Sequence, residues 1–493
     1  MFFLRLLWNF HILRIYYKNF LLRYYLYALL IGVAMLHGQL NAAPNEKNTI
    51  DQTRLKEIAD RLAAKYRIPD YAIAFLNNDS LLFTLEKNSE NAGKNYLIGS
   101  CAKSFTALAV MKLYDEGVID IDQPVKNYLT WFEMKNPDYT RQVTVRHLLN
   151  HKSGFERQDG FFDVKTASVS QFEINMTSLL KELDTHAAPG TAFMYSNLNY
   201  VLLGLIINRV TGHPYAKYFS EYVLPATGMN NTYMSNTENY ENNLIQPFQY
   251  TMFFIPTKSR NYYYSDFLVP AGYISSNITD VSRYIRFMLN KTVGDSGDTL
   301  ISAESYNTLT GKGQTGYAMG WFRYQEDSLE VINHSGLNEN FSSLFTFYPD
   351  LKAGWAILCN INSLEFCGML DQEIKALVLN KTYPKSPVSF EHIMRWSTSI
   401  IPLLILIALI INFRRWSKNE FQFGALKGSG PNIRLVLAIV LSIILLFAVT
   451  GAFDMKMGKV IRFSPDIGWG LVVIAILGIM SGFARYFAKL TRD

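Results

Sequence analysis

Residues 99–105 read Gly-Ser-Cys-Ala-Lys-Ser-Phe and open an apolar-periodic segment that ends at Gly117. The spacing predicts a helix with Ser100 and Lys103 on one face, because residues three apart are neighbours on a helix. A serine hydroxyl becomes an effective nucleophile when a base accepts its proton, and a lysine can do so if burial or nearby positive charge lowers its pKa. The positive end of the helix would also stabilise anionic charge near Ser100. Alone, Ser-x-x-Lys is common and usually marks an ordinary helix start.

Two further motifs carry residues that suit the same chemistry. Tyr195-Ser196-Asn197 precedes a helical pattern, and a phenol near a lysine ammonium can titrate well below its usual pKa of about 10 and relay protons. His334-Ser335-Gly336 lies between two apolar runs that predict strands. A small residue and a glycine on a strand edge allow close approach of a substrate, and a backbone N–H just beyond could form half of an oxyanion hole.

The order and spacing of these three motifs resemble the family of penicillin-binding proteins and serine β-lactamases, and are closest to its class C branch. Four supporting segments of that family have counterparts here: Val143 to Gly154, Pro225 to Met229 with Thr232, Pro270 to Gly272 followed by Ser275 and Asp280, and Gly320-Trp321. The resemblance covers roughly residues 53–380.

The resemblance implies a role for each residue of the predicted site. Ser100 would attack a carbonyl carbon, and Lys103 and Tyr195 would move protons. The backbone N–H groups of Ser100 and Leu337 would hold the oxyanion, Asn197 would orient Lys103 or the substrate amide, and His334, Ser335 and Gly336 would line the substrate. His334 replaces the lysine of many members. A neutral imidazole binds a carboxylate less well than an ammonium does, which argues against classical β-lactam or D-Ala-D-Ala carboxylate recognition.

The predicted fold of residues 44–385 is α+β, with an antiparallel sheet flanked by helices and an all-helical subdomain as the resemblance implies. Strands are expected at 71–76, 81–85, 344–347 and 355–359, so that the first and last strands close the sheet. Helices are expected at 104–117, 200–210 and 280–289.

Both ends of the chain predict membrane segments. Residues 1–43 carry four basic and no acidic residues before a short apolar core, which is typical of a signal peptide or signal anchor. After a linker at 386–396, apolar stretches at about 397–413, 435–453 and 467–487 predict three transmembrane helices. The basic residues favour a cytoplasmic position for the first connection and the tail, which places the catalytic domain on the extracytoplasmic (periplasmic) side of the cytoplasmic membrane.

This architecture resembles the membrane-bound D-amino peptidases that remove an N-acyl-D-amino-acid prodrug motif from nonribosomal peptide products. The resemblance implies a small peptide or acyl-peptide substrate containing a D-amino acid. Leu97 departs from the acidic residue that such a peptidase has three positions before its nucleophile, so the preference for D-asparagine does not carry over. The membrane helices would contact the lipid bilayer as an anchor, and could also support a homodimer or dock the substrate.

Other functions remain open or are disfavoured. The alternatives are an esterase or carboxypeptidase acting on cell-wall components, and a β-lactam-binding sensor whose serine deacylates slowly. The sequence has no Gly-x-Ser-x-Gly elbow and no His-Glu-x-x-His motif, so we expect neither a Ser-His-Asp hydrolase nor a metal, and no cofactor. The charge of +6 belongs to the membrane-flanking ends, and therefore gives no support to nucleic-acid binding. We expect Cys101 to be a packed thiol, and a Cys359–Cys367 pair only if the fold joins them.

Overall fold

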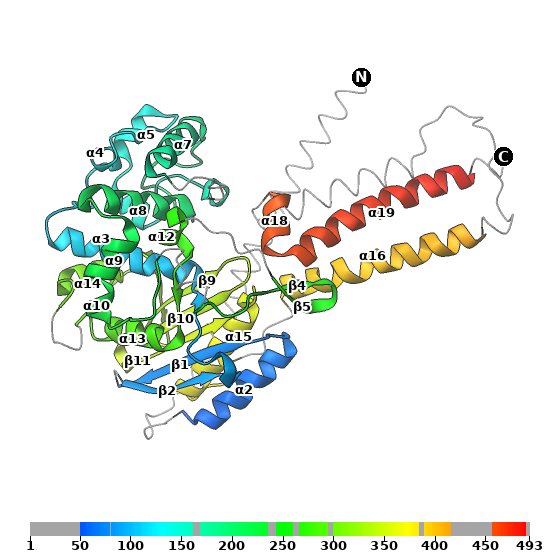
Figure 1. The fold of residues 1–493 in the computed structure, drawn as a ribbon, viewed down its shortest axis with the longest axis horizontal. Coiled ribbons are helices and arrows are strands. Elements are labelled where there is room, and N and C mark those ends of the chain that lie inside the picture. Colours follow the sequence, from blue (N-terminus) through cyan, green and yellow to red (C-terminus); the bar gives the residue numbers. More distant parts are fainter. Residues whose placement is uncertain are drawn as a thin grey trace. The chain divides into compact units, whose positions relative to one another are not determined.

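A computed structural model describes most of the chain after residue 49 (Figure 1). The described ranges are 50–78, 80–160, 168–234, 243–259, 266–293, 299–383, 389–415 and 456–489. The predicted signal segment 1–43 and the second predicted membrane stretch 435–453 lie outside these residues. Neither prediction is therefore tested by the structure.

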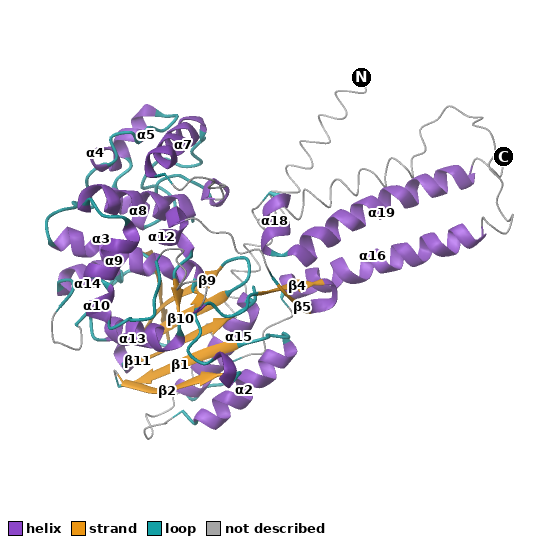
Figure 2. Cartoon of the chain, in the orientation of Figure 1, coloured by secondary structure: helices purple, strands orange, loops and turns teal. Residues whose placement is uncertain are grey.

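A seven-stranded antiparallel sheet in the order β2-β1-β11-β10-β9-β8-β7 forms the centre of the domain (Figure 2). The strands are β1 (Tyr71–Asn77), β2 (Ser80–Glu86), β7 (Gly316–Ala318), β8 (Trp321–Glu326), β9 (Leu329–Leu337), β10 (Ser342–Tyr348) and β11 (Ala353–Cys359). The predicted closure of the sheet is confirmed, because β1 pairs with β11 from Tyr71↔Cys359 to Asn77↔Ala353. Strands β10 and β11 are buried along their whole length, which explains why they read as continuous apolar runs.

Helices cover both faces of this sheet (Figure 1). Helices α2 (Gln52–Lys65) and α15 (Leu364–Val378) pack on one face around a core that includes Leu55, Trp355 and Phe366. Helix α13 (Ile278–Leu289) packs on the other face, where a larger core continues into the helical subdomain. The site lies on this second side of the sheet, since β9 contacts the turn that carries Ser100.

An all-helical subdomain stands beside the sheet, as predicted (Figure 2). It is built from α4 (Val125–Tyr128), α5 (Pro137–Gln142), α6 (Val145–Leu149), α7 (Val169–Glu182) and α8 (Asn197–Thr211). Helices α3 (Ala102–Asp115), α9 (Tyr215–Tyr222), α10 (Leu224–Thr227), α12 (Val269–Gly272) and α14 (Ala303–Leu309) connect it to the sheet. Helix α8 begins at Asn197, which places the Tyr195 motif at its amino terminus.

Two small sheets complete the domain. Strand β3 (Tyr96–Leu97) pairs with β6 (Ser275–Ser276) directly before the Ser100 turn. The hairpin of β4 (Phe248–Thr251) and β5 (Ile255–Lys258) contacts the first C-terminal helix, where Ser399 Oγ accepts a hydrogen bond of 2.8 Å from the Phe253 N–H. The hairpin therefore joins the catalytic domain to the C-terminal helices.

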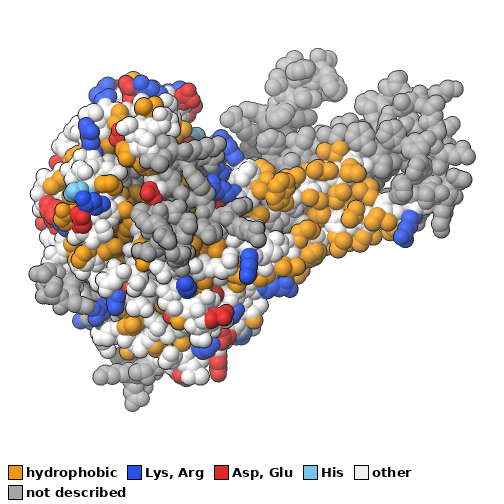
Figure 3. Space-filling model, viewed as in Figure 1, with side chains coloured by type: hydrophobic (Ala, Val, Ile, Leu, Met, Phe, Trp, Pro, Cys, Tyr) orange, Lys and Arg blue, Asp and Glu red, His pale blue; other side chains and the backbone are white. Residues whose placement is uncertain are grey.

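The described C-terminal region contains α16 (Phe390–Arg415), α18 (Met457–Phe463) and α19 (Pro465–Lys489). Among the described residues, one helical stretch, Glu391–Ile411, is long and apolar enough to cross a membrane, and α19 holds a shorter apolar stretch, Pro465–Met480. Apolar side chains gather along the surface of this region (Figure 3). Helix α16 begins at Phe390, so it starts inside the predicted linker 386–396. The three membrane helices remain a prediction.

Candidate active site

Two facing glycines set the position of Ser100. Ser100 lies in a short 3₁₀ turn, η2 (Gly99–Cys101), that leads directly into α3. Gly99 has φ +52°, and a Cβ there would lie 2.3 Å from the Leu337 backbone nitrogen. A Cβ on Gly336 would lie 2.0 Å from the Ile98 carbonyl oxygen. Only glycines permit this close approach, which brings the Ser100 turn against the end of β9.

Lys103 is completely buried and has three oxygen neighbours. Its Nζ lies 3.1 Å from Ser100 Oγ, 2.8 Å from Asn197 Oδ1 and 2.5 Å from the Ala271 carbonyl oxygen. Burial lowers the pKa of Lys103 well below its usual value, and the nearby cation of Arg157 lowers it further. A neutral amine can donate its two N–H groups to Asn197 Oδ1 and the Ala271 carbonyl oxygen, and it keeps one lone pair. At 3.1 Å from Ser100 Oγ, that lone pair can accept the hydroxyl proton of Ser100.

Tyr195 lies beside Lys103 and Ser100. Lys103 Nζ lies 5.0 Å from the centre of the Tyr195 ring, and the His151 ring lies 4.3 Å away, centre to centre. Burial raises the pKa of Tyr195, and this effect outweighs the side-chain hydrogen bond with Ser100 that lowers it. The phenol therefore does not have the lowered pKa that a neighbouring lysine ammonium can produce, because its own burial is the largest effect. At neutral pH Tyr195 therefore keeps its hydroxyl proton.

The residues of the β9 motif take different positions around the cleft. His334 is buried, its Nδ1 lies 2.7 Å from the Ser335 carbonyl oxygen, and its ring packs near Tyr195. Burial lowers the pKa of His334 to about 3, so the imidazole is neutral at physiological pH. Ser335 is exposed, and Leu337 lines the cleft with Ser100. Of the predicted residues, Ser100, Tyr195, Asn197 and Leu337 line one cleft and Lys103 contacts Ser100, whereas His334, Ser335 and Gly336 are not among the described residues that line it.

His151 is a buried neighbour of Tyr195 whose position the sequence analysis did not anticipate. Its Nδ1 lies 3.2 Å from the Ser196 nitrogen, which donates a hydrogen bond to it, and 3.0 Å from Asn199 Nδ2. Burial lowers the pKa of His151 well below its usual value. The ring therefore orients the Tyr195 segment as an uncharged packing partner.

The cleft has a cavity volume of about 90 Å³ and is lined by residues from segments far apart in the sequence. Besides Ser100, Tyr195, Asn197 and Leu337, its lining includes Arg157, Gly160, Leu268, Ala271, Gly272, Tyr273, Asn338, Glu339, Lys459, Arg462 and Phe463. The charged members were not predicted, because no motif connects these distant segments. The only available signal was the cluster of basic residues at 456–462.

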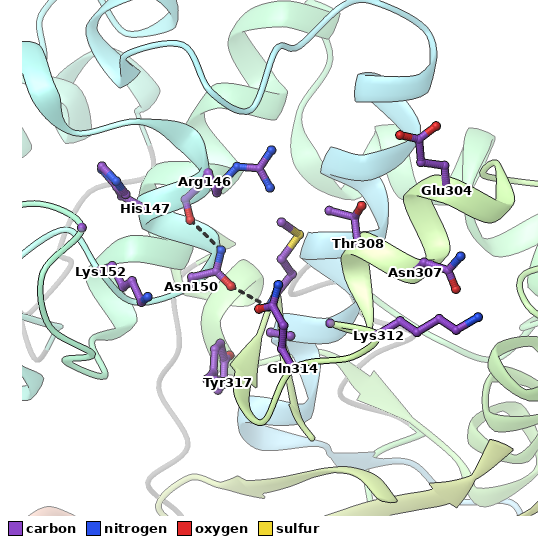
Figure 4. Close-up of a pocket in the computed structure, with 14 residues that line it drawn as sticks. Arg146, His147, Asn150, Lys152, Glu304, Asn307, Thr308, Lys312, Gln314 and Tyr317 are labelled. Atoms are coloured by element: carbon purple, nitrogen blue, oxygen red, sulfur yellow. Dashed lines mark hydrogen bonds between the residues drawn. The ribbon is translucent and has the colours of Figure 1, made fainter. Parts of the chain in front are cut away.

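A larger hollow of about 700 Å³ lies elsewhere, between α6 and the loop after α14 (Figure 4). Asn150 bridges its two sides, donating to the Arg146 carbonyl oxygen at 3.0 Å and accepting from the Met319 N–H at 3.4 Å. None of the predicted catalytic residues lines it. Size alone therefore does not identify the reactive site.

The three cysteines are free and buried. Cys101 Sγ lies 3.1 Å from Ser343 Oγ, and burial raises the pKa of this thiol to about 12, which fits a packed thiol. The fold does bring Cys359 and Cys367 together, with 3.9 Å between their sulfur atoms. Within the described ranges, no group of three or more His, Cys, Asp or Glu side chains is arranged to hold a metal ion.

Comparison with known proteins gives matches over most of this domain. Residues 55–379 match the family described as Beta-lactamase. Protein flp of Staphylococcus aureus (strain N315) is 26% identical over 387 residues, covering 75% of this chain and 76% of the relative. The octameric penicillin-binding protein homologue from Pyrococcus abyssi has a TM-score of 0.57 at 24% identity, covering 68% of this chain and 78% of that one. A D-stereospecific amidohydrolase from Streptomyces sp. has a TM-score of 0.54 at 21% identity, covering 67% and 100%.

Proposed function

Because this chain belongs to the beta-lactamase family and is a serine hydrolase of that type, we propose that it hydrolyses amide or peptide bonds of substrates containing a D-amino acid. The observation that carries the proposal is the 3.1 Å approach of the buried Lys103 amine to Ser100 Oγ. A D-stereospecific amidohydrolase from Streptomyces sp. shares this fold, which supports the choice of D-configured substrates.

Acylation follows from the protonation states of the resting site. The Lys103 amine accepts the hydroxyl proton of Ser100 while Oγ bonds to the substrate carbonyl carbon. Tyr195 gives its proton to the leaving nitrogen and regains one from the Lys103 ammonium, and the C–N bond breaks. Water then attacks the ester carbon, its proton passes to Lys103 and returns to Ser100 Oγ, and the acid is released. Atoms and charges balance over the cycle.

Charge on the substrate oxygen develops at the Ser100 end of the cleft. The Ser100 N–H lies at the start of the turn leading into α3, and the Leu337 N–H lies at the end of β9 against Gly99. Two backbone donors at fixed positions stabilise an oxyanion without reorganising when the reaction occurs. We assign the oxyanion hole to these two groups.

We place the enzyme in the cytoplasmic membrane, with its catalytic domain on the extracytoplasmic side. The support is a described helical stretch of membrane-spanning length and the apolar residues that α16 exposes, including Leu403, Leu404 and Ile407. Exposed apolar surface of this extent is unfavourable in water and suits a lipid environment. The predicted second and third membrane helices complete this proposal.

The experiment that tests the function is intact-mass spectrometry of the wild type and Ser100→Ala, each exposed to a fluorophosphonate, a β-lactam and N-acyl-D-amino-acid amides. We expect fluorophosphonate labelling of the wild type only, and release of free amine from D-configured but not L-configured amides. A lasting β-lactam adduct without amide turnover would replace the peptidase with a penicillin-binding or sensor function. Serine-independent turnover would contradict the acyl-enzyme mechanism.

A further inference from the structure

We infer that α18 is part of the substrate-binding cleft, and that its cations Lys459 and Arg462 bind a carboxylate of the substrate. This inference rests on the proposed function, since it names a substrate class for the Ser100 site. It gives a role in substrate binding to a segment that lies between the second and third predicted membrane stretches. The argument depends on where α18 lies, how it is held and which charges it brings.

Helix α18 reaches the reactive serine although it follows Ser100 by more than 350 residues in the sequence. Lys459, Arg462 and Phe463 line the same narrow cleft as Ser100 and Tyr195. The start of α18 approaches another wall as well: burial raises the pKa of Asp159, in the segment that also carries Arg157, to about 6, and the nearby charge of Lys456 partly opposes this rise. The cleft is therefore bounded in part by the C-terminal region.

Specific contacts hold the end of α18 against the catalytic domain. Asn362 Nδ2 donates a hydrogen bond of 2.8 Å to the Phe463 carbonyl oxygen. Arg462 Nε forms an ion pair of 2.6 Å with Glu339, which also accepts hydrogen bonds of 3.0 Å from the Tyr273 hydroxyl. Both Glu339 and Tyr273 line the cleft themselves. These contacts position the Arg462 guanidinium at the cleft.

Helix α19, which follows α18, packs against α18 and is itself bound to α16. Arg395 of α16 and Asp466 of α19 form an ion pair of 2.6 Å, and both side chains are at least 97% buried. A Cβ on Gly468 of α19 would lie 2.6 Å from Ile461 Cα, so α18 and α19 meet at a glycine. Close packing of this kind gives α18 a defined position, unlike a loose surface loop.

The charge balance of the cleft favours an anionic substrate group. Among the residues that the structure describes, three cations, Arg157, Lys459 and Arg462, line it together with one carboxylate, Glu339. The β9 motif does not provide positive charge, because His334 is buried and neutral above about pH 3. A guanidinium already oriented by one carboxylate can present its planar fork of N–H donors to a second one. Carboxylate recognition is thereby moved from β9 to α18.

The test compares two ligands that differ only in charge: an N-acyl-D-aminoacyl dipeptide with a free carboxylate, and its carboxamide. Each ligand protects Ser100 of the full-length protein from a fluorophosphonate. In the wild type we expect the carboxylate to protect at a concentration about tenfold or more below that of the carboxamide. Lys459→Gln and Arg462→Gln should each reduce this ratio, and the double variant should bring it close to one.

Because both ligands are compared on the same variant, a general loss of labelling in that variant cancels in the ratio of the two protecting concentrations. Lys312→Gln is the matched control, because it removes a lysine that lines the larger hollow (Figure 4), and it should keep the wild-type ratio. Equal protection by both ligands in the wild type, or an unchanged ratio in the double variant, would overturn the inference. So would a ratio that changes only when anionic lipid is added to zwitterionic nanodiscs, because the cations would then bind a headgroup.

Failure of the proposed function is distinguishable from failure of this inference. Calorimetric titration of the same two ligands into Ser100→Ala measures the ratio without any acylation. If Ser100 proves unreactive, the hydrolase function is lost while the carboxylate preference is still decided by that titration. A preference near tenfold for the carboxylate supports the inference, and no preference overturns it.

Discussion

One lysine is buried on each side of the central sheet, and the pKa values of the two lysines are shifted in opposite directions. Lys103, on the side of the active site, has uncharged oxygen neighbours, and burial lowers its pKa. Lys375, on the side of α15, lies 2.9 Å from Asp371 and 2.7 Å from the Tyr324 hydroxyl, and its pKa is raised because these attractions exceed the cost of burial. The difference shows that a neighbouring carboxylate decides whether a buried lysine is a base or a structural cation.

The largest expected effect comes from removing the active-site amine. Lys103→Met retains the apolar stem but leaves Ser100 without a base, so acylation should slow by about 10³-fold or more. Stopped-flow or gel-based measurement of fluorophosphonate labelling gives the rate. Labelling within tenfold of the wild type would show that another group deprotonates Ser100.

Breaking the ion pair of Lys375 and Asp371 should lower the stability of the fold and leave the reactivity of Ser100 unchanged. Asp371→Asn leaves the Lys375 ammonium buried without its counterion and weakens the contacts from Thr346 Oγ1 and Trp355 Nε1, each 2.8 Å from Asp371 Oδ1. We expect the free energy of unfolding to fall by about 3 kcal/mol. Chemical denaturation in detergent measures it, and a Ser100 labelling rate per folded molecule that fell in parallel would contradict the separation of the two lysines.

A sharper test gives Lys103 a neighbouring carboxylate, as Lys375 has. Asn197→Asp places a carboxylate 2.8 Å from Lys103 Nζ, at a helix start where an acidic residue is favourable. The pKa of Lys103 should rise toward the behaviour of Lys375, so that a smaller fraction of the amine is neutral at pH 7. Acylation should slow by about 10- to 100-fold at pH 7, with part of the rate recovered at higher pH.

The control for that variant is its pH profile. A protonated Lys103 cannot accept the hydroxyl proton, so the rate falls as pH falls through the pKa of Lys103 in both proteins. The midpoint should lie at higher pH in Asn197→Asp. An equal loss of rate at every pH would indicate a displaced side chain and no change in proton affinity.

The smallest effect is expected from removing the second partner of Lys375, the Tyr324 hydroxyl. Tyr324→Phe removes the hydroxyl that accepts from Lys375 but keeps the Asp371 ion pair. The free energy of unfolding should decrease by about 1 kcal/mol. A loss as large as that of Asp371→Asn would mean that the hydroxyl, and not the carboxylate, holds the ammonium.

The motifs predicted what depends on local spacing. Ser100 and Lys103 lie on one face of a helix start, Tyr195 and Asn197 at another, and β1 pairs with β11 because both are buried apolar runs. The raised pKa of Tyr195 could not be predicted, because it depends on burial in the folded protein, which no local pattern reveals. The cleft residues Arg157, Glu339 and Arg462 were missed because they come from three segments, distant in the sequence, that only the tertiary fold joins.

The pH dependence of Ser100 acylation by a fluorophosphonate tests most directly whether Lys103 is a neutral base in the resting site. We predict a rate that rises with pH to a plateau, with a midpoint well below the usual lysine pKa of about 10.4, and the loss of this rise in Lys103→Met. A midpoint at or above that value, or the same profile in Lys103→Met, would contradict the mechanism.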